Sequence, residues 1–166
     1  MKAVRVRMRQ LVDWHAALWA GLISGVISFV LSIFLSWYFV KSPWFFTRLV
    51  SSIILGVKVL PPPTTFDLGI FVIALLVFLA IALIYTAIIA TIVHKYGIIV
   101  SFIGGAVVGL AAYAINFYSL SYFFPWFYPY RSWIFVVAHV VFGALAGSLY
   151  ELMEVEVYVH ESEKEK

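Results

Sequence analysis

The sequence predicts an all-α membrane protein, a four-transmembrane-helix bundle with an interfacial amphipathic helix between spans 1 and 2. Three observations support this prediction. The chain is 64% hydrophobic and only 11% charged, with a mean hydropathy of +1.05. Its charged residues leave four long uncharged gaps. Lysine and arginine are distributed unevenly among the ends of those gaps, as in proteins with a fixed orientation in the bilayer.

The composition also excludes several classes of protein. A soluble domain has roughly 25% charged residues, so this chain could not cover its apolar surface in water. Disorder requires low hydrophobicity and is excluded as well. The absence of cysteine rules out disulfides, thiolate nucleophiles and clusters held by cysteine. With 166 residues, the chain fits a single membrane domain, 1–166.

The four gaps define the spans. No Asp, Glu, Lys or Arg lies between Asp13 and Lys41, Asp67 and Lys95, Lys95 and Arg131, or Arg131 and Glu151. Because a helix needs about 20 residues to cross the hydrocarbon, we expect spans at about 16–40, 68–93, 98–122 and 133–149. The last gap is barely long enough, so its helix stands upright or continues past Glu151.

Counting the basic residues predicts the orientation. With the N-terminus inside, seven Lys and Arg lie on the inner face and four on the outer face, which places both termini in the cytoplasm. The first apolar run is far longer than the core of a signal peptide, so we interpret it as a retained helix. Residues 151–166 are then a solvated, largely acidic cytoplasmic tail.

The connection between spans 1 and 2 predicts an amphipathic helix over about 43–60. Ser42 suits an N-cap and Pro43 the first helical position. At about 100° per residue, polar residues occupy one side of this helix and apolar residues the other. We expect the helix to lie in the interface, with a re-entrant segment as the alternative. The polar side consists of Arg48, Ser51, Ser52 and Lys58.

The connection from Phe117 to Trp133 is rich in aromatic residues, which occupy ten of its 17 positions. Such a belt anchors a protein at the membrane interface. The alternative is a docking surface for a partner protein or a quinone-like ligand. The candidate outer aromatic surface consists of Tyr122, Trp126, Tyr130, Arg131 and Trp133.

Small residues recur every four positions in three spans, and they allow helix backbones to approach closely in lipid. We expect these glycine rows to pack one bundle together, with pairing to another subunit as the alternative. Span 1 also repeats serine every four residues, at Ser24, Ser28, Ser32 and Ser36. The candidate packing residues are Gly21, Gly25, Gly105, Gly109, Gly143 and Gly147.

Two pairs of polar residues are candidate sites. Asn116 and His139 lie about six residues from the outer ends of spans 3 and 4, so they can form a hydrogen bond across the pair. This pair is either a structural clamp or a ligand or proton site. His15 and His94 meet near the inner face if spans 1 and 2 are antiparallel, and two such imidazoles could ligate haem b or a metal. The cofactor is otherwise unknown.

Several segments resemble a known family. The strings Leu60–Asp67, Ile115–Tyr118 and Phe124–Phe127, together with Arg131-x-Trp133 and His139-x-x-Phe142-Gly143, are similar to those of small bacterial four-span membrane proteins. Members are uncharacterised and often carry the label sodium:proline symporter. The resemblance implies a bacterial inner-membrane protein. Transporters of that kind have many more helices, broken around a midplane ion site, and nothing here matches that pattern.

Function is predicted from what the spans contain and lack. They have glycine rows and an aromatic belt but no carboxylate, and no common catalytic motif is present. We therefore expect a non-catalytic accessory or assembly subunit of a larger membrane complex, with a respiratory complex as one candidate. The alternatives are a small homo-oligomeric transporter or channel lined by the serines of span 1, and a haem protein or enzyme. Partners are the bilayer and a membrane protein or second copy, but not nucleic acid, since the basic N-terminus is explained by orientation and anionic headgroups.

Overall fold

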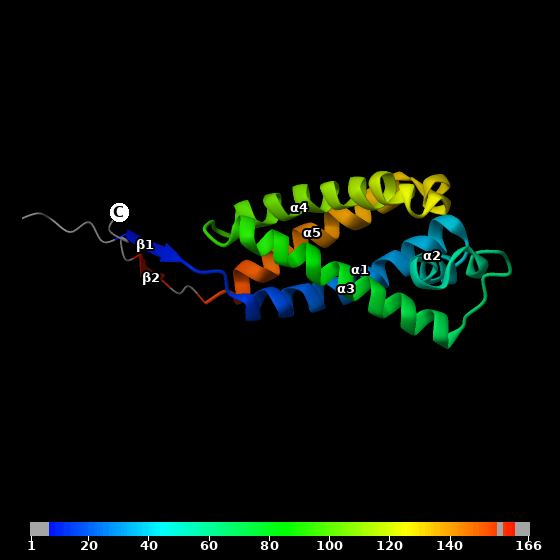
Figure 1. Cartoon of the computed structure of the whole chain (residues 1–166), viewed down its shortest axis with the longest axis horizontal. Helices are drawn as coiled ribbons and strands as arrows, with labels where there is room; N and C mark the ends of the chain where they lie inside the picture. The colour runs from blue at the N-terminus through cyan, green and yellow to red at the C-terminus, as the bar shows by residue number, and fades with distance from the viewer. Residues whose placement is uncertain (1–6, 156–157, 162–166) are drawn as a thin grey trace, which may run out of the picture.

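The computed structural model describes residues 7–155 and 158–161. Four long helices run along the molecule, with α2 and a group of short turns at one end and a strand pair at the other (Figure 1). In chain order the elements are β1 (Arg7–Gln10), α1 (Trp14–Val40), α2 (Trp44–Leu55), η1 (Val57–Val59), α3 (Leu68–Val93), α4 (Ile98–Ala114), η2 (Ile115–Ser119), η3 (Leu120–Tyr122), η4 (Pro125–Tyr130), α5 (Trp133–Met153) and β2 (Tyr158–Glu161).

The predicted all-α membrane bundle is confirmed. Four helices are long and apolar enough to cross a membrane, with 27, 26, 25 and 21 residues. The third is α4 continued through η2 and η3 to Tyr122, which agrees with the predicted end of span 3. The fourth ends at Met153 instead of Leu149, so span 4 continues past Glu151, one of the two outcomes expected for its short gap.

The closest helix contact joins α4 and α5 through glycines. A Cβ atom placed on Gly105 would overlap the carbonyl oxygen of Gly143, and a Cβ on Gly143 would overlap the carbonyl oxygen of Gly105. Gly109 has the same relation to the carbonyl of His139, and Gly147 to that of Ser101. The glycine rows of spans 3 and 4 therefore pack against each other within one chain, and their backbones touch because no side chain intervenes.

The small residues of α1 also face the interior. A Cβ on Gly21 or Gly25 would lie 2.9 Å from a leucine methyl group of α3. The four serines of span 1 are buried as well, with at most 4% of their surface exposed. Ser24 donates to the carbonyl of Ala20 at 2.6 Å. A path lined by these serines would have to run inside the bundle, because they do not face a second copy.

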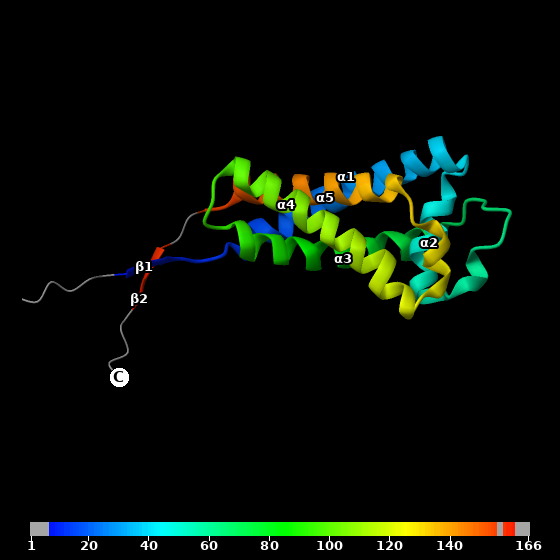
Figure 2. The ribbon, with the colours of Figure 1, turned by 90° about the horizontal axis from the view of Figure 1, so that it is seen from above.

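The helix between spans 1 and 2 is shorter and more buried than the pattern predicts. It ends at Leu55 because Gly56 follows with a φ of 78°, a conformation that favours glycine. Ser42 does not cap it; its hydroxyl pairs with that of Thr64 at 2.5 Å. Figure 2 shows α2 crossing the end of the bundle, where it contacts α1 and α3.

The predicted polar side of α2 is wrong for two residues. Ser51 and Ser52 are fully buried. Each donates to a carbonyl of its own helix, Ser51 to Arg48 and Ser52 to Leu49, so burial leaves neither hydroxyl unpaired. Ser52 also accepts a hydrogen bond from the Trp126 indole at 2.9 Å. Angular periodicity could not show that this face would be covered by the 125–130 segment.

The other end of the bundle is joined by Asp13. Its Oδ1 accepts from the backbone N–H groups of His15 and Ala16 and so caps α1, while Oδ2 accepts from Val155 at 3.1 Å. The backbone N–H of Asp13 donates to the Tyr150 hydroxyl at 3.2 Å. The start of span 1 is thereby connected to the end of span 4, and β1 and β2 lie beyond this end of the bundle.

The solvated-tail prediction missed a strand pair. β1 and β2 pair antiparallel, with Arg7 opposite Glu161 and Gln10 opposite Tyr158. The alternating valines at 155, 157 and 159 are the period-2 signal that indicates a strand. Two strands alone are marginally stable. Here they lie side by side because β1 precedes α1 and β2 follows α5, and the start of α1 and the end of α5 lie at the same end of the bundle (Figure 1).

The glycine contact yields a stability prediction. Gly105→Ala should destabilise the protein by about 1–3 kcal/mol, because its Cβ has to push apart two helix backbones. Gly104→Ala is the matched control, since its Cβ meets only a Val93 methyl group, at 3.3 Å. Unfolding in mild detergent measures both. Equal stability of the two variants would contradict close backbone packing.

Asp13 should make stability dependent on pH. Its hydrogen bonds from backbone N–H groups, that of Ala16 first, hold the Asp13 pKa below the ordinary value of an aspartate. A lowered folded-state pKa adds stability above the unfolded pKa, and this contribution is lost as the pH falls through the folded value. Asp13→Asn keeps a capping oxygen and should lose less stability between pH 6 and pH 3 than the wild type. An identical loss of stability on acidification in the two proteins would contradict the role of the Asp13 carboxylate.

Candidate functional site

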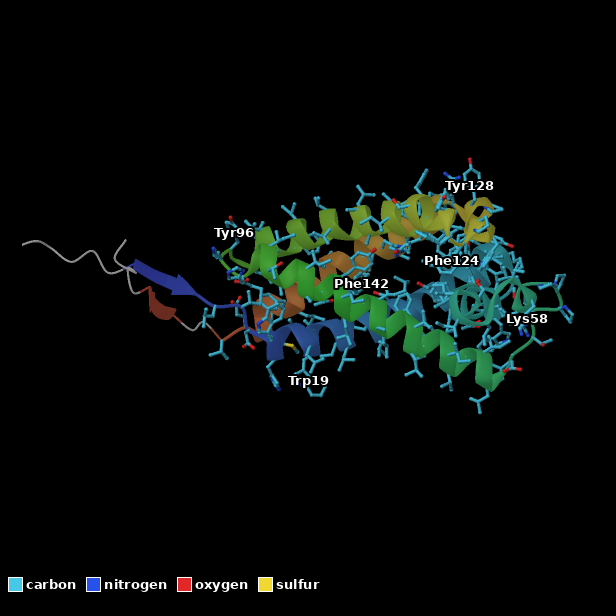
Figure 3. All side chains as sticks on the ribbon, viewed as in Figure 1. Trp19, Lys58, Tyr96, Phe124, Tyr128 and Phe142 are labelled. Atoms are coloured by element: carbon cyan, nitrogen blue, oxygen red, sulfur yellow. The ribbon has the colours of Figure 1, made fainter. Side chains whose placement is uncertain are left out.

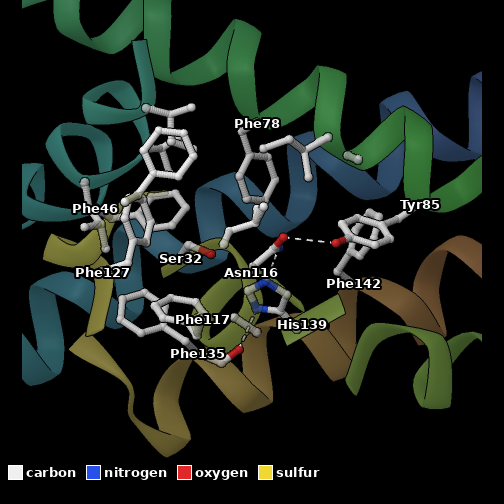
Figure 4. A pocket seen from close by; sticks show the side chains of 18 residues that line it. Ser32, Phe46, Phe78, Tyr85, Asn116, Phe117, Phe127, Phe135, His139 and Phe142 are labelled. Carbon is white, nitrogen blue, oxygen red and sulfur yellow. Dashed lines mark hydrogen bonds between the residues drawn. The ribbon is translucent and has the colours of Figure 1, made fainter. Parts of the chain in front are cut away.

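The centre of the site is a chain of three polar side chains from three helices. The Asn116 side-chain nitrogen lies 3.2 Å from Nε2 of His139, the contact expected from their equal depth. The Tyr85 hydroxyl on α3 donates to Oδ1 of Asn116 at 3.0 Å. Nδ1 of His139 lies 2.8 Å from the carbonyl oxygen of Phe135. Figure 4 shows these bonds as dashed lines.

One backbone carbonyl determines the donor and the acceptor in each hydrogen bond of this polar chain. The Phe135 oxygen can only accept, so Nδ1 of His139 carries the hydrogen and a neutral ring has a free lone pair on Nε2. Asn116 must then donate from its nitrogen, which leaves its oxygen to accept from Tyr85. All three groups are neutral in this arrangement and each is paired, which is how polar groups are accommodated in a bilayer.

Local structure explains why Asn116 reaches His139. The helix of span 3 widens into a π-helical turn at Ile115–Ser119, and such turns often occur at functional sites. Two stacked rings of span 3 pack against the imidazole: those of Tyr113 and Phe117 lie edge-on to it at 5.7 and 5.9 Å. The glycine contact of α4 with α5 sets the spacing at which these rings and the amide meet the histidine.

Sequence reasoning missed Tyr85, although a signal was present. A tyrosine inside an otherwise apolar span needs a partner for its hydroxyl, because an unpaired polar group is costly in lipid. What the sequence could not indicate was which face of α3 turns toward α4 and α5.

A cavity of about 80 Å³ lies against this polar chain. Its walls come from α1, α2, α3, α5 and the 116–127 segment, and Figure 4 shows the side chains around it. Seven phenylalanines line it, and the polar lining consists of Ser32, Tyr85, Asn116 and His139. The phenylalanines are Phe46, Phe78, Phe117, Phe124, Phe127, Phe135 and Phe142.

The cavity exists because α2 separates two helices. α3 and α4 are joined by a short loop at the end of the bundle near β1 and β2. They diverge toward the other end, where α2 lies between them (Figure 1). Phe46 of α2 packs against Phe78 of α3 and Phe135 of α5, at ring-centroid distances of 5.7 and 6.4 Å. Because Phe46 lies between them, α3 and α5 cannot pack directly against each other here, and the cavity remains between them.

The structure gives each histidine of the other candidate pair a separate partner. Nε2 of His15 accepts from the Trp19 indole at 3.2 Å, and Nδ1 of His94 lies 3.0 Å from the carbonyl of Thr91. Within residues 7–155 and 158–161, no group of three or more His, Cys, Asp or Glu side chains could hold a metal ion. A metal or haem site at His15 and His94 therefore remains an expectation from helix direction alone.

The predicted outer aromatic residues do not form one surface. Trp126 turns inward to Ser52, and the Tyr130 ring packs on Phe45 at 4.8 Å, whereas Tyr122 is 86% exposed. The Arg131 guanidinium stacks on the Tyr128 ring at 3.2 Å and on Tyr118 at 4.3 Å. Figure 3 places Phe124 and Tyr128 at the same end of the molecule as Lys58, opposite Trp19 and Tyr96.

Trp133 belongs to a different surface, which the sequence analysis did not single out. Its ring packs edge-on against Phe39 at 5.0 Å, and Phe39 in turn contacts Tyr38 at 4.8 Å. With Phe34 and Trp37, these rings form an exposed aromatic surface on the last turns of α1 and the first of α5.

The class of protein follows from these features: a multi-pass helical membrane protein with a neutral polar chain beside an apolar cavity. Comparison with protein families, with curated proteins and with solved structures finds no match for the chain.

The polar contact can be measured with a double-mutant cycle on Asn116→Leu and His139→Leu. We expect a coupling energy of about 0.6 kcal/mol, and at most about 1.7, as for other hydrogen bonds in membranes. Unfolding of the four proteins in detergent provides the values. Additive effects from two folded single variants would show that the pair does not interact.

Proposed function

We propose that this chain is a non-catalytic accessory subunit of a larger membrane complex and that it holds a lipid-soluble molecule in its cavity. The observation that carries the proposal is the cavity itself, with apolar walls and a few convergent polar groups, the usual composition of a small-molecule site. A respiratory complex is the kind of partner we favour, since its chemistry uses lipid-soluble molecules.

The chemistry of the lining favours binding over catalysis. A nucleophile is activated by a neighbouring base, a lowered pKa or a metal, and a general base needs a lone pair free to reach the proton that it removes. Here the one imidazole accepts from an amide and donates to a backbone carbonyl. No Asp, Glu, Lys or Arg is among the residues that line the cavity. These groups can orient a guest molecule through hydrogen bonds.

The transporter alternative has less support. The one Asp, Glu, Lys or Arg inside the four spans is Glu151, two residues before the end of span 4, whereas coupled transport usually needs a titratable or ion-binding group near mid-membrane. The serines expected to line a path between copies face the interior of one chain. The exposed aromatic surface around Trp37 and Trp133 supports a lateral partner, because aromatic residues are enriched at interfaces.

Purification from its native membrane in mild detergent tests the proposal. We expect a larger partner protein and a lipid-soluble molecule near one per chain to copurify, the latter identified by mass spectrometry of an organic extract. Leu120→Trp should remove the molecule by filling the cavity, while Leu110→Trp, at an exposed position on α4, should not. A chain without partner and without bound molecule would refute the proposal.

We also propose a bacterial inner membrane with both termini in the cytoplasm, supported by the family resemblance and the distribution of basic residues. The chain has no cysteine, so single cysteines report sidedness directly. Lys58→Cys should react with an impermeant maleimide in intact cells, whereas Tyr96→Cys, exposed at the other end, should react only after permeabilisation. The reverse pattern would invert the topology.

A further inference from the structure

We propose that the cavity binds the ring of a neutral quinone or quinol lipid, which enters sideways from the bilayer. This inference rests on the proposed function and specifies its ligand. Three features of the cavity carry it: the charge of its lining, the hydrogen-bonding capacity left on its polar chain and the shape of its walls.

The lining selects a neutral molecule. Eighteen residues line the cavity, and none is an acid, a lysine or an arginine. An ionised headgroup placed there would lose its water without gaining a counter-charge, which is far more costly than burying a neutral group. Phospholipid headgroups and fatty-acid carboxylates are therefore disfavoured.

The polar chain keeps both a donor and acceptors for a guest. Asn116 uses one N–H on His139 and one lone pair on Tyr85, so a second N–H and a second lone pair remain. The Tyr85 oxygen donates its hydrogen and keeps its lone pairs. A ring carbonyl can accept from Asn116, and a ring hydroxyl can donate to Asn116 or Tyr85. A quinone has the first group and a quinol has the second.

The walls suit a flat ring better than a flexible chain. Seven phenylalanines surround the space, and they already pair edge-on and stacked, with Phe117 and Phe135 stacked at 5.1 Å. Another ring can join such a cluster in either geometry. The volume exceeds what one water molecule needs, yet the mostly apolar walls offer water few partners.

The entrance faces lipid. The partly exposed lining residues Phe78 and Ile81 come from α3, and Leu120 and Phe124 from the segment after α4. At the α2 end the route is covered, because the Trp126 indole bonds Ser52 across the top of α2. A molecule dissolved in the bilayer thus reaches the polar chain between α3 and residues 120–124, with its tail left in the hydrocarbon.

Binding of two probes to the full chain in nanodiscs tests the inference. Decylubiquinone has a ring and carbonyls, whereas dodecyl acetate has a carbonyl and a chain but no ring. We expect one saturable site for decylubiquinone and none for dodecyl acetate. Asn116→Leu should raise the Kd for decylubiquinone about 3- to 18-fold, the equivalent of one membrane hydrogen bond.

Two tryptophan variants, one in the cavity and one on the outer surface of α4, keep the test decisive if Asn116→Leu fails to fold. Leu120→Trp should abolish saturable binding, and Leu110→Trp should bind like the wild type. Equal binding of both probes would overturn the ring inference and leave the proposed function standing. Ring binding unaffected by Leu120→Trp would also overturn it. Absence of saturable binding by either probe would overturn the inference, whereas the proposed function is decided separately by the copurification of a partner protein and a bound molecule.

Discussion

The contact between the backbones of α4 and α5 is the constraint on which the rest of the structure depends. In lipid no hydrophobic force draws two apolar helices together, so close approach has to be made by residues without side chains. Gly105 and Gly143 meet carbonyl to α-carbon. At that spacing the amide of Asn116 reaches the imidazole of His139, and the rings of Tyr113 and Phe117 pack edge-on against it. Larger side chains in place of these glycines would separate these groups.

A second constraint acts in the opposite direction. Whereas glycines bring α4 and α5 together, α2 keeps α3 away from them at one end of the bundle. Phe46 of α2 lies between Phe78 and Phe135. The hydroxyls of Ser51 and Ser52 donate within their own helix, so these two serines bring no unpaired hydroxyl into the core. The cavity is the space between a tight helix pair and a displaced third helix.

Neutrality links the site to its proposed role. Each polar group of the chain Tyr85, Asn116 and His139 is satisfied by the next, and the last by a backbone carbonyl. Such a chain is stable in a membrane without a charge, and the hydrogen-bonding capacity that remains is directed at whatever occupies the cavity. A neutral site of this kind suits recognition of an uncharged molecule and the proposed role beside a catalytic partner.

The sequence by itself determined the spans, because the absence of charge over some 20 residues is a local property that the bilayer tests directly. It also indicated the Asn116–His139 contact, since equal depth and facing glycines depend only on helix geometry. Tyr85, the burial of Ser51 and Ser52, the cavity and the strand pair were decided by tertiary structure. In each of these cases the outcome depends on which faces of distant segments meet, and the residues next to a position in the sequence do not determine that.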